Sequence, residues 1–334
     1  MHKGILTTIG NTPLVKLTRL FRSSDFNLFA KMESFNPGGS VKDRAALNII
    51  ESALDLGLIK SGDTVIESSS GNMGIGLAQV CAYYGLHFIC VVDPKTTPLN
   101  IEILKAFGAI VDLVSTPDPQ TGEYLHARID RVKTLLGTID NSFCPDQYRN
   151  PGNPLAHHRT MREIAIELNG HVDFLFCATS TCGTMRGCAE YVKTHNLRTK
   201  LYAVDAVGSV IFGGKPAKRL IPGHGAAVKP ALFKPDLADD CIHVTDAQCV
   251  IGCRRLAREE AILAGGSSGA IIMAVETIKH LIPKGANCVV ILPDRGERYL
   301  NTIFSDEWVN KHIGDVSSLL REYAENKQHA SLSV

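Results

Sequence analysis

The sequence predicts an α/β protein with parallel-rich sheets. Short β-branched and apolar runs alternate with helix-like patterns along most of the 334 residues, and Gly, Pro or polar residues bound each run. Continuous apolar strands separated by helices are typical of buried parallel sheets with right-handed crossovers. Because the chain is longer than a usual single core, two domains are expected.

In the amino-terminal half, apolar runs and helix patterns follow one another closely. Strands are predicted over 64–67, 87–93 and 109–114, helices over 75–84 and 99–107, and a Pro-rich turn over 116–121. Gly85 is placed to end the first of these helices. The loop-like segment 141–154 is the best candidate for a boundary between two α/β units.

The carboxyl-terminal half repeats the alternation. Strands are predicted over 173–178, 201–205 and 288–292, and helices over 185–194, 247–264 and 269–281. Residues after about 312 are polar and are expected to fray.

Composition narrows the class of protein. Hydrophobic residues make up 45% of the chain and charged residues 21%, which is ordinary for a globular enzyme. The net charge is +1, and no Lys/Arg run stands out, so neither nucleic acid nor a membrane surface is expected as a partner. The amino terminus lacks an apolar signal region, and no apolar run reaches transmembrane length.

The ten cysteines are scattered and form no C-x-x-C pair. Neither a disulfide framework nor a metal site is expected from this spacing. Most of the cysteines lie in apolar runs, where a free thiol acts as a small hydrophobe. A reducing, cytoplasmic location is the prediction.

The segment Pro37–Arg44 delivers Lys42 from a Pro-Gly-Gly loop to the start of a helix. Glycines allow a sharp turn and close approach to a ligand, and the positive end of the helix dipole favours a neutral amine. A neutral lysine is the form that a nucleophile or a Schiff base needs. Taken alone, the segment also fits a solvated Lys-Asp-Arg cluster on a surface helix.

Two Ser/Thr-rich turns each follow a predicted strand and precede a predicted helix. Residues 67–74 (Glu-Ser-Ser-Ser-Gly-Asn-Met-Gly) direct hydroxyls and amides to one place and suit a carboxylate, although a plain βα turn has the same pattern. Residues 179–184 (Thr-Ser-Thr-Cys-Gly-Thr) suit a phosphate monoester. Neither turn has the spacing of a dinucleotide fingerprint or a Walker loop, which disfavours a nicotinamide dehydrogenase.

Two further segments complete an ordered set. Residues 264–270 form a Gly-Ser turn before a helix, and residues 290–299 run from a strand into a polar loop. Together with residues 10–15, these motifs resemble fold-type-II pyridoxal-phosphate enzymes, the cysteine synthase and cystathionine β-synthase family, over about residues 5–305. The resemblance implies a tryptophan synthase β-like fold of two three-layer α/β domains. It implies a larger cofactor-binding domain (1–40 plus 146–312), a smaller mobile substrate domain (41–145) and a polar tail (313–334).

The resemblance also assigns roles within a pyridoxal 5′-phosphate site. Lys42 would form a Schiff base with the cofactor and then act as the base at the substrate Cα. Asn72 would bind the cofactor's ring oxygen, and Ser267 would face its pyridine nitrogen. The phosphate would be bound by Ser180, Thr181, Cys182, Gly183 and Thr184. A neutral Ser267 leaves the ring a weaker electron sink, which favours loss of a β-substituent over transamination.

Within the family, residues 92–95, 205–213 and 292–296 most resemble members that join O-phospho-L-serine to L-glutamate through an aminoacrylate, on the way to 2,3-diaminopropionate for siderophores or antibiotics. The substrate carboxylate would be bound by Ser69, Ser70 and the loop of Gln147. Met73 and Tyr148 depart from the usual cysteine synthase Thr and Phe, which favours a modified substrate pocket. Cations for anionic substrates would come from Arg128, Arg186 or Arg219; for Arg128, a surface ion pair is an equal alternative.

Three hypotheses follow from the sequence. The first is β-replacement on O-phospho-L-serine with L-glutamate, by a homodimer as the family resemblance implies. The second is cysteine synthase activity, with O-acetylserine or O-phosphoserine and sulfide. The third is a catalytically silent relative that binds an amino acid or a partner protein; the combination of Lys42, Asn72 and Ser267 argues against it.

Overall fold

The computed structural model describes residues 4–22, 24–119, 122–318 and 320–321, and contains two sheets. The larger has the order β1-β2-β10-β7-β8-β9, and only the β1–β2 pair is antiparallel. Its strands are β1 (Leu14–Leu17), β2 (Asn27–Met32), β7 (Phe174–Ala178), β8 (Lys200–Ala206), β9 (Asp240–Val244) and β10 (Asn287–Leu292).

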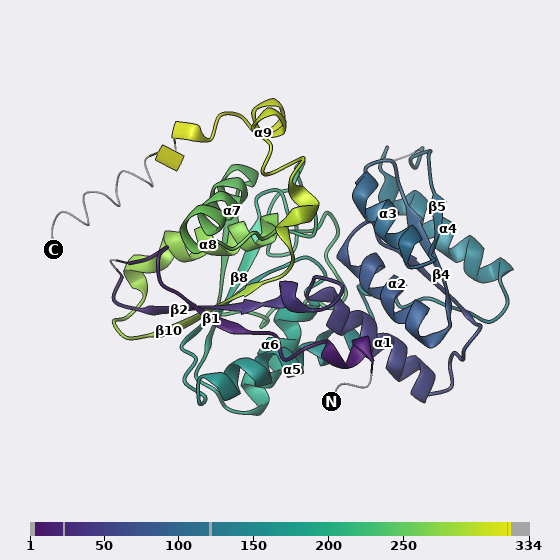
Figure 1. Cartoon of the computed structure of the whole chain (residues 1–334), viewed down its shortest axis with the longest axis horizontal. Coiled ribbons are helices and arrows are strands. Elements are labelled where there is room, and N and C mark those ends of the chain that lie inside the picture. Colours follow the sequence, from purple (N-terminus) through teal and green to yellow (C-terminus); the bar gives the residue numbers. More distant parts are fainter. Residues whose placement is uncertain (1–3, 23, 120–121, 319, 322–334) are drawn as a thin grey trace.

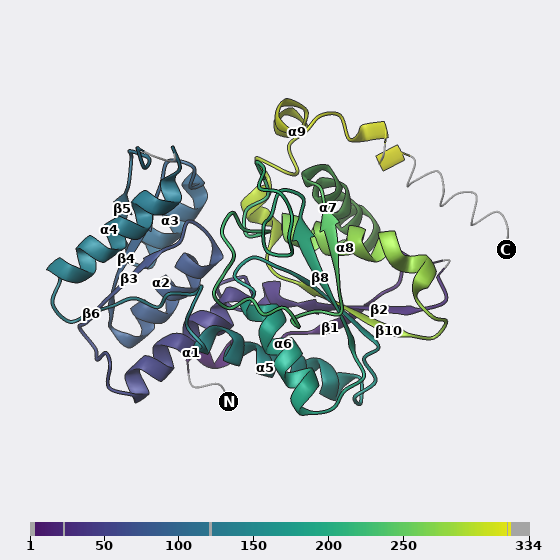
Figure 2. The same cartoon turned by 180° about the vertical axis from the view of Figure 1, so that it is seen from behind.

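The smaller sheet has the order β5-β4-β3-β6 and is parallel throughout. Its strands are β3 (Thr64–Ser68), β4 (His87–Val92), β5 (Ile110–Leu113) and β6 (Ser142–Phe143). In Figures 1 and 2 the two sheets, with their helices, lie side by side, and α1 lies between them.

Helices cover both faces of each sheet. The α-helices are α1 (Lys42–Asp55), α2 (Asn72–Tyr84), α3 (Pro98–Ala106), α4 (Tyr124–Thr138), α5 (Gly152–Glu167), α6 (Gly183–Thr194), α7 (Asp246–Glu260), α8 (Gly266–Ile278) and α9 (Asp306–His312). Short 3₁₀ turns are η1 (Ile5–Thr8), η2 (Glu33–Phe35), η3 (Lys279–Leu281) and η4 (Gly296–Tyr299). No helix within the described ranges is long and apolar enough to span a membrane.

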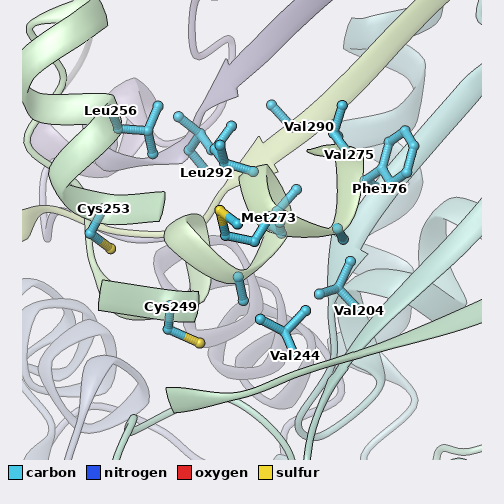
Figure 3. Packing of buried hydrophobic residues seen from close by; sticks show 14 of the residues in the cluster. Phe176, Val204, Val244, Cys249, Cys253, Leu256, Met273, Val275, Val290 and Leu292 are labelled. Carbon is cyan, nitrogen blue, oxygen red and sulfur yellow. The ribbon is translucent and has the colours of Figure 1, made fainter. Parts of the chain in front are cut away.

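The hydrophobic cores follow this layering. One face of the large sheet packs against α7 and α8, through residues such as Phe176, Val244 and Met273 (Figure 3). Its other face packs against α5 and α6. The small sheet buries one face against α1 and α2 and the other against α4. The predicted pair of three-layer α/β units is therefore confirmed, while the boundaries and mobility of the domains stay predictions.

Most predicted elements are present within a few residues of their expected bounds. Gly85 ends α2 in the left-handed conformation, with a φ of 66°. α7 is shorter than predicted: the chain leaves the helix at Ala261, and Ala264 forms a bridge with Arg295. The segment predicted as loop over 141–154 contains β6 and the start of α5.

Some predictions fall wholly or partly outside the described residues. The Pro-rich turn includes residues 120–121, and most of the tail 313–334 lies beyond residue 321. All ten cysteines lie within the described ranges and are free thiols.

Candidate active site

Lys42 is the first residue of α1 and lines a cavity at the carboxyl ends of the large sheet's central strands. The other lining residues are Val41, Cys177, Ala178, Ser180, Thr181, Cys182, Gly183, Thr184, Gly223, Ile291 and Pro293. Burial of its amine lowers the pKa of Lys42, and the opposing effects of Cys177, Asp294 and Cys182 are smaller. The environment therefore favours the neutral amine that a nucleophile needs.

The glycine loop before Lys42 is packed by side chains of the protein itself. Asp43 accepts a hydrogen bond from the Gly38 amide at 2.6 Å, and a Cβ at Gly38 would lie only 2.6 Å from the same carboxylate. Gly39 has a φ of 84°, and its open side faces the guanidinium of Arg298. The two glycines are thus needed for the close packing of Asp43 and Arg298, which fixes the loop that carries Lys42.

Opposite Lys42, residues 180–184 form an anion cradle. Cys182 has a φ of 66°, a conformation that side-chain-bearing residues rarely adopt. Such a left-handed residue directly before a helix turns successive amides towards one point, and the first amides of α6 have no acceptor within the helix. Burial raises the pKa of the Cys182 thiol to about 12, so it stays neutral beside an anion. The conformation, the hydroxyls and the neutral thiol fit a bound phosphate.

α5 supports this cradle with two residues that the sequence analysis missed. Asn153 donates to Thr181 Oγ1 at 3.2 Å and to the carbonyl of Gln147 at 2.7 Å. His157, fully buried, contacts Thr184 Oγ1 at 3.3 Å and Thr160 Oγ1 at 3.1 Å. Burial, followed by the charge of Lys42, lowers the pKa of His157 well below its usual value, so the ring is neutral. The i, i+4 spacing of these residues is a detectable signal only once a helix is assigned there.

Asn72, the first residue of α2, is joined to the loop after β10. Its Nδ2 donates to Asp294 Oδ2 at 2.7 Å, and its Oδ1 accepts from Arg298. Asp294 also accepts from the Tyr299 hydroxyl at 2.5 Å. Burial raises the pKa of Asp294, whereas Tyr299, Asn72, Arg298 and Lys42 act in the opposite direction. The network places Asn72 and Lys42 around one buried carboxyl group.

Ser267 is the second residue of α8 and is buried. The adjacent turn reaches the same network, because the Gly265 amide donates to the Asp294 carbonyl at 3.3 Å. Neither Ser267 nor Asn72 belongs to the described lining of the Lys42 cavity. Both are connected to Asp294, Asn72 by its side-chain hydrogen bond and Ser267 through the adjacent turn at Gly265.

The residues predicted to bind the substrate carboxylate lie on two neighbouring loops. Ser69 Oγ accepts from the Gly74 amide at 2.9 Å, and the Ser70 carbonyl accepts from Asn100 at 2.9 Å. Gln147 is buried, and its amide donates to Glu67 Oε2 at 3.3 Å. Ser69 therefore caps the first turn of α2, while its hydroxyl hydrogen remains available for a ligand.

Tyr148 brings two of the predicted arginines into one neighbourhood. Although 39% of the residue is exposed, its hydroxyl lies among protein atoms. Burial of the hydroxyl, followed by the charge of Glu67, raises the pKa of Tyr148, whereas Arg128 and Arg219 lower it. Arg128 Nε lies 3.3 Å from Asp93, but the two side chains are only 15% and 7% exposed, so this is a largely buried pair and not the surface ion pair considered as an alternative. Arg219 donates to the His224 carbonyl at 3.1 Å and leaves its buried Nε without a partner among the described residues. Arg186 pairs with Glu190 on its own helix at 2.8 Å.

Comparison with known proteins agrees with this geometry. A family model described as "Pyridoxal-phosphate dependent enzyme" matches residues 5–294. An N-(2-amino-2-carboxyethyl)-L-glutamate synthase of Ralstonia nicotianae is 46% identical over 308 residues, which cover 92% of this chain and 91% of the relative.

Three solved structures of similar fold each align with this protein over 98% of their own length. A hydrogen sulfide-producing enzyme from Fusobacterium nucleatum has a TM-score of 0.84 at 33% identity over 90% of this chain. An O-ureido-L-serine synthase has a TM-score of 0.83 at 32% identity over 92%. An O-acetylserine dependent cystathionine beta-synthase from Helicobacter pylori has a TM-score of 0.82 at 32% identity over 90%.

Proposed function

The chain belongs to the pyridoxal-phosphate dependent enzyme family, and on that premise we propose that it replaces the phosphate of O-phospho-L-serine with the amino group of L-glutamate. In this reaction the Cβ–O bond of phosphoserine breaks, a Cβ–N bond forms, and inorganic phosphate leaves. The product is N-(2-amino-2-carboxyethyl)-L-glutamate. The observation that carries the proposal is the cavity in which Lys42 faces the anion cradle of residues 180–184.

We propose that Lys42 and three other parts of the site hold pyridoxal 5′-phosphate. Lys42 would bind it covalently, residues 180–184 would hold its phosphate, Asn72 would donate to its ring oxygen, and Ser267 would face its ring nitrogen. When bound, the cofactor supplies an electron sink for a carbanion at the substrate Cα. A hydroxyl at Ser267 suits this role because it does not force a proton onto the ring nitrogen, which favours departure of a β-substituent.

Lys42 would also move the proton. When free, the desolvated amine of Lys42 would be the base that takes the proton from the substrate Cα and later returns it. This requires an amine that is neutral near physiological pH, and burial of Lys42 acts in that direction. Ser69, Ser70, Gln147 and the backbone around Asn72 would bind the substrate carboxylate meanwhile.

Selectivity for a phosphorylated donor would come from the neighbourhood of Tyr148. Arg128 and Arg219 both act on its hydroxyl, and together they offer positive charge to a leaving phosphate. The named relative supports glutamate as the second substrate. Cysteine synthase activity remains the alternative, because one solved relative is an O-acetylserine dependent cystathionine beta-synthase and another is a hydrogen sulfide-producing enzyme of similar fold.

We also propose that the enzyme works as a cytoplasmic homodimer in 2,3-diaminopropionate biosynthesis, for a siderophore or an antibiotic. The family resemblance supports this assembly, and sedimentation of the purified protein tests it. In the same way, closure of residues 41–145 over the substrate stays a proposal, which small-angle scattering with and without O-phospho-L-serine can test.

The function is tested by offering the purified enzyme two donors and two nucleophiles. O-Phospho-L-serine and O-acetyl-L-serine are each combined with L-glutamate or with sulfide, and products are identified by mass and by phosphate release. The proposal predicts N-(2-amino-2-carboxyethyl)-L-glutamate from O-phospho-L-serine and L-glutamate as the preferred product. Preference for O-acetyl-L-serine and sulfide would contradict it and support cysteine synthase activity, and no turnover with any pair would support the silent alternative.

A further inference from the structure

The side-chain amide of Asn72 is hydrogen-bonded through both its oxygen and its nitrogen. Its Oδ1 accepts from the guanidinium of Arg298, and its Nδ2 donates to Asp294 at 2.7 Å. Arginine can only donate, and an ionised carboxylate can only accept. These two partners therefore select one of the two possible amide orientations, with Oδ1 towards Arg298 and Nδ2 towards Asp294 and the neighbouring Tyr299.

Asp294 is itself held rigidly. It is 2% exposed, and its Oδ2 accepts both from Asn72 and from the Tyr299 hydroxyl at 2.5 Å. Its other oxygen, Oδ1, is buried without a hydrogen-bond partner among the described residues. A Cβ at Gly265 would overlap this oxygen, so the glycine turn before α8 provides the space for the carboxyl group.

The same network reaches the loop of Lys42. Arg298, which fixes the Asn72 oxygen, also donates to the carbonyl of Gly38 and packs against Gly39. The residues that contribute come from the loop before α1, from the start of α2 and from the segment after β10. One cluster thus connects the glycine loop of Lys42 with the turn of Asn72.

We propose that Asp294 is a positioning residue that acts through Asn72: with Arg298, it holds the amide in the orientation that presents Nδ2, and not Oδ1, to the cofactor. This inference rests on the proposed function, because it assumes that Asn72 donates to the ring oxygen of pyridoxal 5′-phosphate. A residue that serves only to stabilise the loop would affect cofactor binding independently of Asn72.

A double-mutant cycle separates these roles, because a residue that acts only through Asn72 has no effect once Asn72 is absent. Apo-forms of the wild type, Asn72→Ala, Asp294→Ala and the double variant are titrated with pyridoxal 5′-phosphate. The dissociation constant and the visible absorption band are recorded. Asp294→Ala should weaken binding about tenfold, the equivalent of one net hydrogen bond, and shift the band as Asn72→Ala does. In the Asn72→Ala background it should change the constant less than twofold.

Three further variants guard against a general loss of structure. Asp294→Asn should bind the cofactor nearly as the wild type does, because one amide oxygen can take both bonds that Oδ2 now accepts. Tyr299→Phe should weaken binding a few-fold, whereas Tyr84→Phe, which removes a comparable 2.7 Å bond to Glu51, should not. The thermal midpoints of all apo-forms are measured in parallel.

The outcomes are distinct. A tenfold loss on Asp294→Ala in both backgrounds would overturn the proposal and make Asp294 an independent structural residue. An Asp294→Asn variant as weak as Asp294→Ala would also overturn it. Failure of the wild type to bind pyridoxal 5′-phosphate would instead contradict the proposed function itself.

Discussion

Arg44 and Glu163 form a two-bond ion pair directly behind the lysine-bearing end of α1. Arg44 Nη1 and Nη2 donate to the two oxygens of Glu163 at 2.8 and 2.7 Å, and the residues are 119 positions apart. Arg44 also pairs with buried Glu33 at 2.7 Å, and Lys31 pairs with Glu163 at 2.7 Å. This cluster ties α1 to α5 and β2, two residues after Lys42.

We predict that Glu163→Gln destabilises the protein by roughly 3 kcal/mol at pH 7, because it leaves Arg44 and Lys31 with less compensating charge in a buried site. Burial raises the pKa of Glu163, but Arg44 and Lys31 outweigh it and hold the pKa at about 2. The stabilisation is therefore complete above pH 4.5 and is lost as the pH falls towards 2. Urea unfolding of the two proteins at several pH values measures it.

Glu102→Gln is the matched control, because Glu102 forms an exposed pair with Lys105 at 3.1 Å and should change stability very little. Equal effects of the two substitutions would contradict the importance of the buried cluster.

Glu67 should have the opposite pH dependence. Burial raises its pKa to about 7, while hydrogen bonds from the amides of Gln147 and Ser68 act in the opposite direction. A raised carboxyl pKa means that the folded state favours the protonated form, so this contribution to stability is present below pH 4.5 and is lost as the pH rises to 7. We predict that Glu67→Gln removes this loss. The free energy of unfolding of the variant, relative to that of the wild type, should therefore be up to about 3 kcal/mol higher at pH 8 than at pH 4.5. A pH-independent difference between the two proteins in urea unfolding would refute the assignment.

Arg219 should distinguish the two donors by charge. If Arg219 contacts the leaving phosphate, Arg219→Ala should lower kcat/KM for O-phospho-L-serine by a factor equivalent to about 2–3 kcal/mol of transition-state stabilisation. It should hardly affect any activity on O-acetyl-L-serine. Arg186→Ala removes an arginine that is paired within α6 and should leave both donors unaffected. Equal losses on both donors would make Arg219 structural, and Arg128 would then be the candidate.

A negative charge at position 267 should preserve cofactor binding but reduce turnover. We predict that Ser267→Asp binds pyridoxal 5′-phosphate and loses roughly a hundredfold in turnover, because a carboxylate would hold the ring nitrogen protonated. Ser267→Ala is the control for loss of the hydroxyl alone. Near-wild-type turnover of Ser267→Asp would show that this residue does not face the ring.

Local sequence patterns were sufficient to predict the helices and strands that carry a clear hydrophobic pattern or a glycine at their end. The buried strands β4, β7 and β10 contain continuous apolar runs, and α2 ends at a glycine, so each could be predicted from its own residues. β9 is only partly buried, and α5 begins with Gly-Asn-Pro, so neither has a comparable signal. The motifs identified Lys42, Asn72 and the cradle as candidates.

The contacts between these motifs could not be predicted in this way. Asn72 and Asp294 are 222 positions apart, and the left-handed backbone of Cys182 occurs at a residue type that does not favour it. Both depend on tertiary packing, which brings distant loops together at the carboxyl ends of the strands. Asn153 and His157 were missed for the same reason, because their helix was not predicted.

The central claim, that Lys42 is the residue that binds the cofactor, has a direct test. The purified protein, loaded with pyridoxal 5′-phosphate, is reduced with borohydride, digested and mapped by mass spectrometry, alongside Lys42→Ala. We expect a yellow protein with the label on Lys42, and no covalent label and no turnover in Lys42→Ala. A label on any other lysine of the wild-type protein, or full turnover by Lys42→Ala, would contradict it.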